Sequence, residues 1–364
     1  MAIIVIVMHD LRGGGAEKMM VRLANQLSAN GDSVHLVLTA EGGVNKKFVN
    51  ENVNLVELGC ERTLSSFGKL RKTLKAIEPD AILSVLTHIN VIAGITCFSL
   101  GWQSKLSVSE RNAFSLDRAL KTDRVMKLVY FIAPFIYQLL PKPVIAVSKG
   151  VADDLVEHTM VKRKNVTTAS NPVITVETIE ASKSAPQHEW IINSDIPVLL
   201  SIGRLSHQKG FDLLLKAFSL VQSEIKCRLI IYGEGELRED LVEQVNELSL
   251  SEVVSFPGYI ANPIAEMKAA DLYILSSRFE GSPNAIVEAM SVNTPVIAFD
   301  CPHGPKEILR DGTVAPLVEY LDVDALAKAI VSTLKAKKPV DYTQDVARFS
   351  SANSANEYRR LLLE

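Results

Sequence analysis

The chain has 364 residues, of which 47% are hydrophobic and 22% are charged, and its net charge is −3. This is the composition of a globular protein, and the length is sufficient for two domains that each have their own core. The slightly negative charge argues against a polyanion-binding surface, so we do not expect nucleic acid as a partner, whereas a small anion can still bind in a local basic cleft.

The cysteines and the N-terminus both indicate a cytoplasmic protein. Cys60, Cys97, Cys227 and Cys301 are widely spaced and form no C-x-x-C pair, so we interpret them as reduced, buried thiols. The apolar N-terminus, Met1–Met8, lacks a basic leader and continues directly into a glycine-rich turn. It is therefore predicted to be a buried first strand and not a signal peptide.

In the first half of the chain, short apolar and β-branched runs alternate with helix-like segments. Strands are predicted at Ala2–Met8, Ser33–Thr39, Asp80–Leu86, Lys105–Ser109 and Val144–Ser148, and helices at Ala16–Ala29 and Leu64–Ile77. Alternating strands and helices are typical of a parallel sheet, so residues 1–172 are predicted to form one Rossmann-like, doubly wound α/β domain.

The same alternation restarts after a polar stretch from Asn171 to Ser194, which we interpret as a hinge. Strands are predicted at Val198–Ile202, Arg228–Tyr232, Val253–Phe256, Leu272–Ser276 and Pro295–Phe299. A second Rossmann-like domain is expected over residues 173–345, followed by a C-terminal helix, 346–364, that returns to the first domain. Ligands bind outside the carboxyl ends of strands in open α/β sheets, so the active site is expected in a cleft between the domains.

A glycine loop, Gly13–Gly15, follows the first strand and opens a helix. Its backbone N–H groups are suited to bind an anion or to let a substrate approach closely. A tight β–α turn with no ligand is the alternative. The loop does not match G-x-G-x-x-G, so a dinucleotide cofactor is not expected.

Two cations, Arg204 and Lys209, lie five positions apart in the loop after the strand Val198–Ile202. Binding of a single diphosphate would explain why both cations are present in this loop. A cation about 4 Å from a phosphate contributes ~4 kcal/mol at an effective dielectric constant of about 20, before its desolvation cost. A tenfold rate increase requires only ~1.4 kcal/mol, so stabilising a departing diphosphate is a sufficient reason for the pair. A solvated basic loop is the alternative.

Glycine turns end the next two strands, at Gly233–Glu236 and at Pro257–Tyr259. Their backbone groups are either open to a ligand or simply form turns, and the pattern alone does not distinguish the two.

The segment from Arg278 to Glu288 places two carboxylates eight positions apart across a strand-to-helix turn. Glu280 follows a predicted strand, and Glu288 lies one to two turns into a helix. Between them Gly281 permits close approach, Ser282 can cap the helix and Pro283 suits its first position. Free N–H groups at this helix start predict a pocket for a polar, phosphorylated ligand.

These motifs, taken in order together with Pro295–Ala298, strongly resemble glycosyltransferase family 4, whose members are retaining enzymes of the GT-B fold. The resemblance covers nearly the whole chain, and Gly13–Glu17 matches the N-terminal glycine loop of the family. Within the family the chain is most similar to bacterial enzymes that extend lipid-linked oligosaccharides, O-antigens or capsules.

The resemblance implies roles for the matching residues. Arg204 and Lys209 would bind the donor diphosphate, Glu280 the hydroxyls of the donor sugar and Glu288 those of the ribose. Arg204, Lys209 and Glu280 are the residues expected to be catalytic. Further donor contacts are expected from Gly14, Gly203, Gly233, Glu234, Tyr259, Gly281, Ser282, Pro283 and Asn284.

One departure from the family lies in Val108–Asn112, where many members carry a His near the donor sugar and this chain has Glu110 and Arg111. Either Arg111 supplies a positive contact there, or the role has moved, or the two residues are a salt-bridged structural pair. Other acceptor-side candidates are Gly13, Gly15 and His88, although a lone His at a strand end is often structural.

We expect neither a metal nor another cofactor, and the nucleotide-sugar is a substrate. The sequence does contain Asp322-Val323-Asp324, a D-x-D pattern found in metal-dependent glycosyltransferases of another fold. It directly precedes a helical run, where Asp is explained by capping.

The segment Leu128–Leu140 is uncharged and strongly apolar but too short to span the ~30 Å of a bilayer. It is either a buried core helix or an interfacial element, with Arg118, Lys121, Arg124 and Lys127 nearby to meet anionic lipid. A cytoplasmic protein, peripheral on the inner membrane, is the expectation that follows from the second interpretation.

We therefore expect a retaining transfer of a hexose or N-acetylhexosamine from a nucleotide-sugar to a hydroxyl of a glycan or polyprenyl-diphosphate-linked glycan. Resemblance in Cys301–Glu307 favours UDP, with a GDP-mannose-dependent mannosyltransferase as the alternative. A sugar phosphorylase or a nucleotide-sugar epimerase would share the fold. A non-catalytic nucleotide-sugar-binding assembly protein is the alternative of another class.

Overall fold

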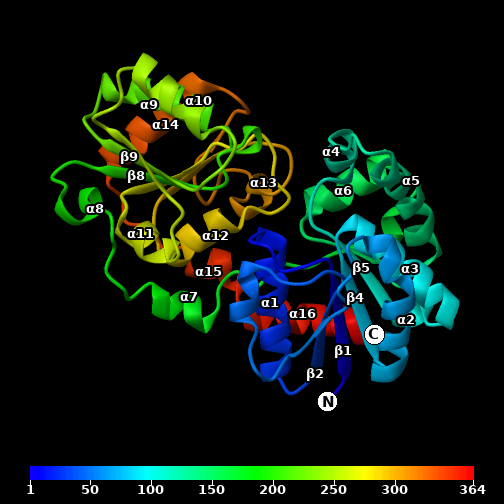
Figure 1. Cartoon of the computed structure of the whole chain (residues 1–364). Helices are drawn as coiled ribbons and strands as arrows, with labels where there is room; N and C mark the ends of the chain where they lie inside the picture. Colours follow the sequence, from blue (N-terminus) through cyan, green and yellow to red (C-terminus); the bar gives the residue numbers. More distant parts are fainter. The chain divides into compact units, whose positions relative to one another are not determined.

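The computed structural model describes residues 1–364 and divides into two compact units (Figure 1). The N-terminal unit comprises Met1–Val173 together with Arg348–Glu364, and the C-terminal unit comprises Ile174–Ala347. The last helix, α16 (Ser351–Leu363), therefore belongs to the N-terminal unit, where Arg359 forms an ion pair with Asp32 at 2.7 Å. No helix of the chain is both long enough and apolar enough to cross a membrane.

The N-terminal unit is built on a seven-stranded parallel sheet with the strand order β3-β2-β1-β4-β5-β6-β7. The strands are β1 (Ile3–Met8), β2 (Ser33–Leu38), β3 (Asn54–Glu57), β4 (Ala81–Val85), β5 (Leu106–Glu110), β6 (Val144–Ala146) and β7 (Val166–Thr168). The helices are α1 (Gly15–Ala29), α2 (Phe67–Ile77), α3 (Thr87–Leu100), α4 (Phe114–Ala119), α5 (Arg124–Leu139), α6 (Lys149–His158) and α16, with short 3-10 turns η1 (Val44–Phe48), η2 (Thr63–Ser66), η3 (Gln103–Lys105) and η4 (Arg163–Asn165).

The C-terminal unit is built on a six-stranded parallel sheet with the strand order β10-β9-β8-β11-β12-β13. The strands are β8 (Val198–Ile202), β9 (Arg228–Tyr232), β10 (Val254–Gly258), β11 (Leu272–Leu275), β12 (Val296–Phe299) and β13 (Leu317–Val318). The helices are α7 (Val176–Ala181), α8 (Glu189–Asn193), α9 (Phe211–Gln222), α10 (Arg238–Glu247), α11 (Pro263–Ala269), α12 (Asn284–Ser291), α13 (Pro305–Ile308), α14 (Val323–Ala336) and α15 (Thr343–Val346), with 3-10 turns η5 (His207–Lys209) and η6 (Ala347–Phe349).

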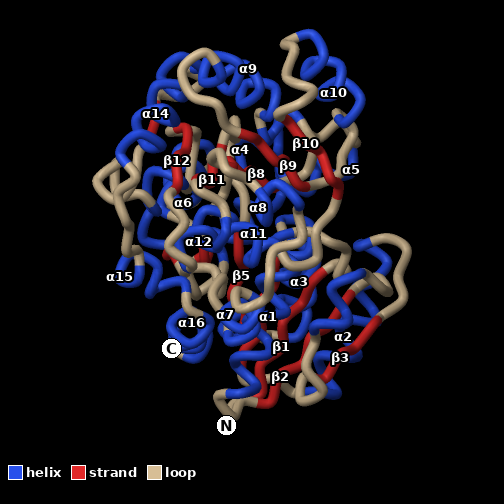
Figure 2. Tube along the Cα trace, turned by 90° about the vertical axis from the view of Figure 1, so that its left-hand side faces the viewer, coloured by secondary structure: helices blue, strands red, loops and turns tan.

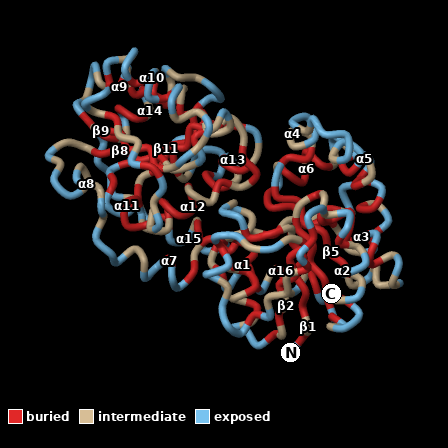
Figure 3. The backbone as a smooth tube through the Cα atoms, viewed as in Figure 1, coloured by how far each residue is buried: buried red, intermediate tan, exposed pale blue.

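The central strands are largely apolar and buried because helices cover both faces of each sheet. Every residue of β1 from Ile4 to Met8 is fully buried, as are Leu199 and Leu200 of β8. In Figure 2 the strands lie inside each unit with helices around them, and Figure 3 shows the buried residues concentrated on the same strands. Each unit therefore has its own core, as the composition predicts.

In each sheet the strand order reverses beside the first strand of the unit. β1 pairs with both β2 and β4, and β8 pairs with both β9 and β11. Ligands of open α/β sheets bind at such switch points, outside the carboxyl ends of the strands. The loops and helix starts that follow β1, β4, β8 and β11 carry Gly13–Gly15, His88, Arg204 with Lys209, and Glu280.

Three strands and two helices were not expected from the sequence. β3, β7 and β13 are edge or near-edge strands of two to four residues, too short for a clear apolar pattern. The polar stretch interpreted as a hinge contains α7 and α8, each of five or six residues. Short surface helices bury few side chains, so their sequences show no clear hydrophobic pattern.

Candidate functional site

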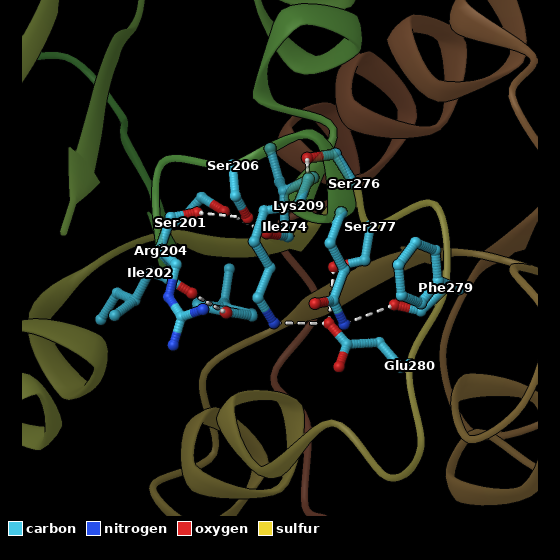
Figure 4. Close-up of polar contacts among 12 residues, drawn as sticks. Ser201, Ile202, Arg204, Ser206, Lys209, Ile274, Ser276, Ser277, Phe279 and Glu280 are labelled. Atoms are coloured by element: carbon cyan, nitrogen blue, oxygen red, sulfur yellow. Dashed lines mark hydrogen bonds and ion pairs between the residues drawn. The ribbon is translucent and has the colours of Figure 1, made fainter. Parts of the chain in front are cut away.

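The cation Lys209 and the carboxylate Glu280 meet at the switch point of the C-terminal sheet. Lys209 ends η5, which follows β8, and Glu280 lies in the loop between β11 and α12. The Lys209 Nζ atom is 2.6 Å from Glu280 Oε1, and Ser277 Oγ donates to the same oxygen at 2.7 Å (Figure 4). The Glu280 side chain is 8% exposed and that of Lys209 is 22% exposed, so the pair is shielded but still reachable.

Three hydrogen bonds fasten the two loops that carry this pair. The Arg278 backbone N–H donates to the Gln208 carbonyl at 2.7 Å, and Gln208 Nε2 donates to the Phe279 carbonyl at 3.0 Å. Ser276 Oγ donates to the Lys209 carbonyl at 2.9 Å. Because backbone atoms of both loops take part, these bonds hold the backbone of the two loops together at Lys209 and next to Glu280.

An ion pair of Arg278 and Asp212 holds the outside of the same turn. The two guanidinium nitrogens of Arg278 lie 2.8 and 2.7 Å from the Asp212 oxygens, and Nη1 also donates to the His207 carbonyl at 2.9 Å. Burial opposes ionisation of Asp212, but the hydrogen bonds and charge of Arg278 lower its pKa below the usual value. Arg278 is therefore a structural residue, although it begins the motif singled out in the sequence.

Gly210 is required where the turn enters α9. Its φ is +63°, and a Cβ atom placed there would lie 2.2 Å from the Ser276 carbonyl oxygen. No L side chain fits such an approach, so this glycine allows the η5 turn to pack directly on the loop after β11.

The loops after β8, β9 and β10 are joined edge to edge. The Gly203 N–H donates to the Tyr232 carbonyl at 3.0 Å, and the Gly233 N–H donates to the Gly258 carbonyl at 2.9 Å. A Cβ atom on Gly233, whose φ is +140°, would lie 1.8 Å from the Gly203 carbonyl oxygen. The predicted donor residues Gly203, Gly233, Glu234 and Tyr259 therefore lie at neighbouring strand ends, and Tyr259 is 78% exposed.

The turn before α12 differs from the expectation in two respects, because Ser282 does not cap the helix and Pro283 is the N-cap residue and not the first helical residue. The helix begins at Asn284, and its N-cap residue is Pro283, with no side-chain capping bond. The prediction that Ser282 caps the helix is therefore wrong, because Ser282 lies one residue before the N-cap position. Gly281 and Pro283 are buried in this turn, whereas Ser282 and Asn284 are partly exposed.

Glu288 lies on α12 and is 7% exposed. Burial, and then the negative charges of Glu280 and Glu288, raise the pKa of Tyr273, so both carboxylates lie near this tyrosine. Tyr273 Oη is 3.4 Å from the Ile202 carbonyl at the end of β8. Tyr273 and Ser277 were not identified from the sequence. Their polar atoms within a buried run, Leu272–Ser277, are the signal that was available.

Arg204 differs from Lys209 in having no protein partner for its charge. Its side chain is exposed, and its guanidinium forms no ion pair or hydrogen bond. Figure 4 shows the side chains of Arg204 and Lys209 extending to the same side of the loop. The two predicted cations therefore face one region, with Glu280 beside Lys209.

In the N-terminal unit, His88 lies at the start of α3, and its ring contacts that of His9 in an edge arrangement with 5.4 Å between centroids. Burial, and then the charges of His9 and Lys121, lower the pKa of His88 to about 4. His88 is therefore neutral at pH 7. The glycine loop follows β1, the strand beside β4 in the sheet, and Gly14 is the N-cap of α1. Gly13 and Gly15 flank it.

Glu110 at the end of β5 is 2% exposed and is held by its own unit. Thr87 Oγ1 donates to both of its oxygens at 3.1 Å, Asn90 Nδ2 donates at 3.3 Å, and Tyr137 Oη donates to Oε1. Burial raises the pKa of Glu110 to about 7.

Arg111 is 6% exposed and points to other partners. It donates to Tyr358 Oη of α16 at 2.8 Å and to Asn171 Oδ1. Glu110 and Arg111 therefore do not form the salt-bridged pair that was one of the alternatives. A contact of Arg111 with an acceptor requires exchange of these bonds.

The D-x-D pattern has a capping function. Asp322 is the N-cap of α14, and its Oδ1 atom accepts a hydrogen bond from the Ala325 N–H at 2.8 Å. The chain contains no group of three or more His, Cys, Asp or Glu side chains arranged to hold a metal ion. All four cysteines are buried and unpaired.

Two family models match the chain, one on each half. The model described as Glycosyltransferase Family 4 matches residues 13–177, and the model described as Glycosyl transferases group 1 matches residues 182–348. Together the two matches cover most of the sequence.

Individual relatives give the same assignment. An uncharacterised glycosyltransferase of Methanocaldococcus jannaschii is 30% identical over 252 residues, which are 66% of this chain and 60% of that protein. This chain thus spans less than two thirds of that relative. N-acetylgalactosamine-N,N'-diacetylbacillosaminyl-diphospho-undecaprenol 4-alpha-N-acetylgalactosaminyltransferase of Campylobacter jejuni is 26% identical, over 92% of this chain and 90% of its own length.

Solved structures match the fold over the whole chain. A glycosyltransferase of Rickettsia africae has a TM-score of 0.82 at 16% identity and covers 99% of this chain and 97% of its own. HepE of Anabaena, solved in complex with UDP and glucose, has a TM-score of 0.76 at 19% identity, with 100% and 96% covered. The two parallel-sheet units are thus those of the GT-B fold.

Proposed function

The chain belongs to glycosyltransferase family 4 and is a transferase of the GT-B fold acting in glycan biosynthesis, and on this premise we propose its substrates and mechanism. The donor is a UDP-linked hexose or N-acetylhexosamine. The acceptor is a hydroxyl of a glycan carried on a polyprenyl diphosphate, and the configuration at the transferred carbon is retained. Family membership sets aside the alternative of a non-catalytic assembly protein.

One observation supports the donor site most directly, namely the contact of Lys209 with Glu280 at the β8–β11 switch point. A nucleotide-sugar needs cations for its diphosphate and a carboxylate for the hydroxyls of its sugar, and it needs them next to each other. Lys209 and Glu280 supply these groups at adjacent positions, and Arg204 adds a cation with no protein partner. Glu288, further along α12, is assigned to the ribose.

The proposed reaction requires no protein nucleophile. The acceptor hydroxyl attacks on the face from which the diphosphate departs, the bond from the sugar carbon to the phosphate oxygen breaks, and the departing phosphate accepts the proton of the hydroxyl. Lys209 and Arg204 stabilise the charge that develops on the leaving group, which is the part of the reaction that electrostatic preorganisation helps most. Glu280 orients the donor sugar, and no metal takes part.

The choice of donor and acceptor has support from relatives. The Campylobacter jejuni relatives are named for transfer of N-acetylgalactosamine to diphospho-undecaprenol-linked sugars, and HepE was solved with UDP and glucose. A lipid-linked acceptor is held at a membrane, so the enzyme is proposed to be cytoplasmic and to act as a peripheral protein on the inner face of the membrane.

The experiment is a nucleotide-release screen of UDP- and GDP-sugars against a lipid-linked glycan extract, with and without a chelator, followed by mass analysis of the product. We expect release of UDP and a product heavier by one hexose or N-acetylhexosamine, unchanged by the chelator. Release of GDP with a product heavier by one hexose would replace the UDP assignment with a GDP-mannose one. Product formed from donor and inorganic phosphate, or from donor alone, would instead indicate a phosphorylase or an epimerase.

A further inference from the structure

The helix α5 has two apolar faces. Its inner face carries the buried residues Val129, Tyr130, Ala133, Ile136 and Tyr137, which pack toward α3 and the sheet. Its outer face carries five large apolar side chains that are exposed, and we call these the α5 stripe: Val125 (49%), Leu128 (56%), Phe131 (66%), Phe135 (44%) and Leu139 (68%). Exposed and buried residues alternate along α5 in Figure 3.

The stripe forms a continuous surface. Its members recur every three or four residues, the spacing that places side chains on one side of a helix. The rings of Phe131 and Phe135 lie 5.6 Å apart between centroids. A contiguous exposed apolar surface of this kind marks an interaction site in a soluble protein fold.

Buried hydrogen bonds prevent the helix from rolling to hide this surface. On the inner face Asn90 Nδ2 donates to Tyr137 Oη at 3.1 Å, and Tyr137 Oη donates to Glu110. Two turns earlier Tyr130 Oη lies 3.3 Å from Asp117 Oδ2. Rotation of α5 would break these bonds and leave buried polar groups without partners, so the stripe stays on the outside.

A strongly basic segment adjoins the stripe. Arg118, Lys121, Arg124 and Lys127, which we call the basic band, lie just before α5 and in its first turn. From Arg118 to Lys142 the chain has five basic residues and one acidic residue, Asp123, whereas the whole chain has a net charge of −3. Asp123 is the N-cap of α5 and accepts from the Met126 N–H at 2.9 Å.

We propose that the α5 stripe and the basic band bind the surface of an anionic lipid bilayer, with α5 lying in the plane of the headgroups. The apolar side chains enter the boundary of the acyl chains, and the cations pair with lipid phosphates. The positive charge of the basic band favours an anionic bilayer over a second copy of the chain. A second copy of the chain would bring a second set of the same cations to the surface, whereas anionic headgroups bring opposite charge.

The proposal rests on the proposed function in one respect only. A lipid-linked acceptor lies in the membrane, which gives the enzyme a reason to bind there. It adds to that function a defined surface. The element that holds the lipid, α5, also holds Glu110 at the carboxyl end of β5 through Tyr137. The same helix thus contacts the lipid with its outer face and the candidate acceptor residue Glu110 with its inner face.

The test is co-sedimentation of the full chain with two kinds of vesicle, phosphatidylcholine alone and phosphatidylcholine mixed equally with phosphatidylglycerol. Two double variants address the two parts of the surface, Phe131→Ser with Phe135→Ser, and Arg124→Glu with Lys127→Glu. Matched controls in the same unit are Leu64→Ser, which alters another exposed apolar residue, and Lys72→Glu with Lys75→Glu on the exposed side of α2. Thermal unfolding of each variant reports whether it is folded.

We expect the wild-type chain to bind anionic vesicles more tightly than neutral ones by about tenfold or more, and binding to weaken as salt rises. Each double variant on α5 should lose about tenfold or more of this binding, and the controls should keep it. Equal binding to both kinds of vesicle, or unchanged binding by both folded variants, would overturn the proposal. Self-association of the wild type that Phe131→Ser with Phe135→Ser abolishes would overturn it as well.

A second arm separates this proposal from the proposed function. Transfer to a water-soluble glycan acceptor, in the absence of vesicles, should be the same for wild type and both α5 variants. If no sugar is transferred to any acceptor while anionic vesicles still bind, the proposed function is wrong and the lipid-binding surface is supported. If transfer occurs and vesicles do not bind, the lipid-binding proposal is wrong and the proposed function is supported.

Discussion

The Nζ atom of Lys209 lies 2.6 Å from the Oε1 atom of Glu280, although 71 residues separate the two in the chain. They meet because β8 and β11 are neighbours in the sheet and the loops after them are joined by one backbone–backbone and two side-chain-to-backbone hydrogen bonds. In this contact the cation and the carboxylate neutralise each other. Under the proposed function the donor exchanges this contact, so that its diphosphate binds Lys209 and its sugar hydroxyls bind Glu280.

Replacement of Glu280 by Gln should separate nucleotide binding from turnover. The amide keeps the shape of the side chain but no longer holds the charge of Lys209, so free UDP should bind as tightly as to the wild type or more tightly. Turnover with the UDP-sugar should fall by about tenfold or more, since the sugar loses a charged acceptor. Calorimetry with UDP and steady-state kinetics measure the two effects. Weaker UDP binding together with normal turnover would exclude this role.

Ser277 is expected to position Glu280 without touching the donor. Ser277→Ala removes the 2.7 Å hydrogen bond to Glu280 Oε1, and the net cost to stability should be about 1 kcal/mol. kcat should fall several-fold while KM for the donor stays near the wild-type value. The matched control is Ser201→Ala, because Ser201 is equally buried and donates only to the Ile274 carbonyl. An equal fall of kcat in both variants would mean that the effect is structural.

Glu288→Ala should weaken the binding of free nucleotide, because the proposed partner of this carboxylate is the ribose. Loss of a charged acceptor for hydroxyl groups should cost about 1.5 to 3 kcal/mol of binding free energy, or roughly 10-fold to 100-fold in Kd. Calorimetry with UDP measures it. Affinity equal to that of the wild type would remove Glu288 from the ribose site.

Stability should depend on pH through Glu110. Burial raises its pKa to about 7 in the folded chain, compared with a reference value of 4.5. Between these values the folded state binds the proton and the unfolded state does not, so the contribution of Glu110 to stability falls as pH rises from about 4.5 to 7.

Glu110→Gln removes this titration. The unfolding temperature of the variant minus that of the wild type should therefore rise between pH 5 and pH 8, by roughly 2 °C or more. Thermal unfolding monitored by circular dichroism at several pH values measures this difference. A difference that is flat with pH, or that falls, would show that Glu110 is not a neutral buried acid near pH 7.

The sequence was a good guide to the strands that carry the site and a poor guide to the contacts within it. β8 and β9 have the predicted bounds because each is an apolar run between turn residues. β3 and β13 were missed because edge strands this short carry little pattern. The GT-B fold implied by the family resemblance is confirmed by the two parallel sheets and the matching structures.

The side-chain partners depend on tertiary packing and could not be predicted. Nothing in the spacing of Ser277 indicates that it binds Glu280. Ser282 was predicted to cap α12, but Pro283 holds that position. Arg111 reaches Tyr358 across 247 positions of the sequence, a contact that exists only because α16 returns to the N-terminal unit. The roles assigned to the donor and acceptor residues stay predictions until the variants are measured.

The most direct test of the account is the turnover of Lys209→Ala at saturating donor, compared with Lys216→Ala, which alters an exposed lysine on α9 of the same unit. If Lys209 stabilises the departing diphosphate, its loss should lower kcat by about 100-fold or more while the variant remains folded. Lys216→Ala should turn over like the wild type. A folded Lys209→Ala enzyme with wild-type kcat would contradict the assignment of the Lys209–Glu280 contact to the donor site.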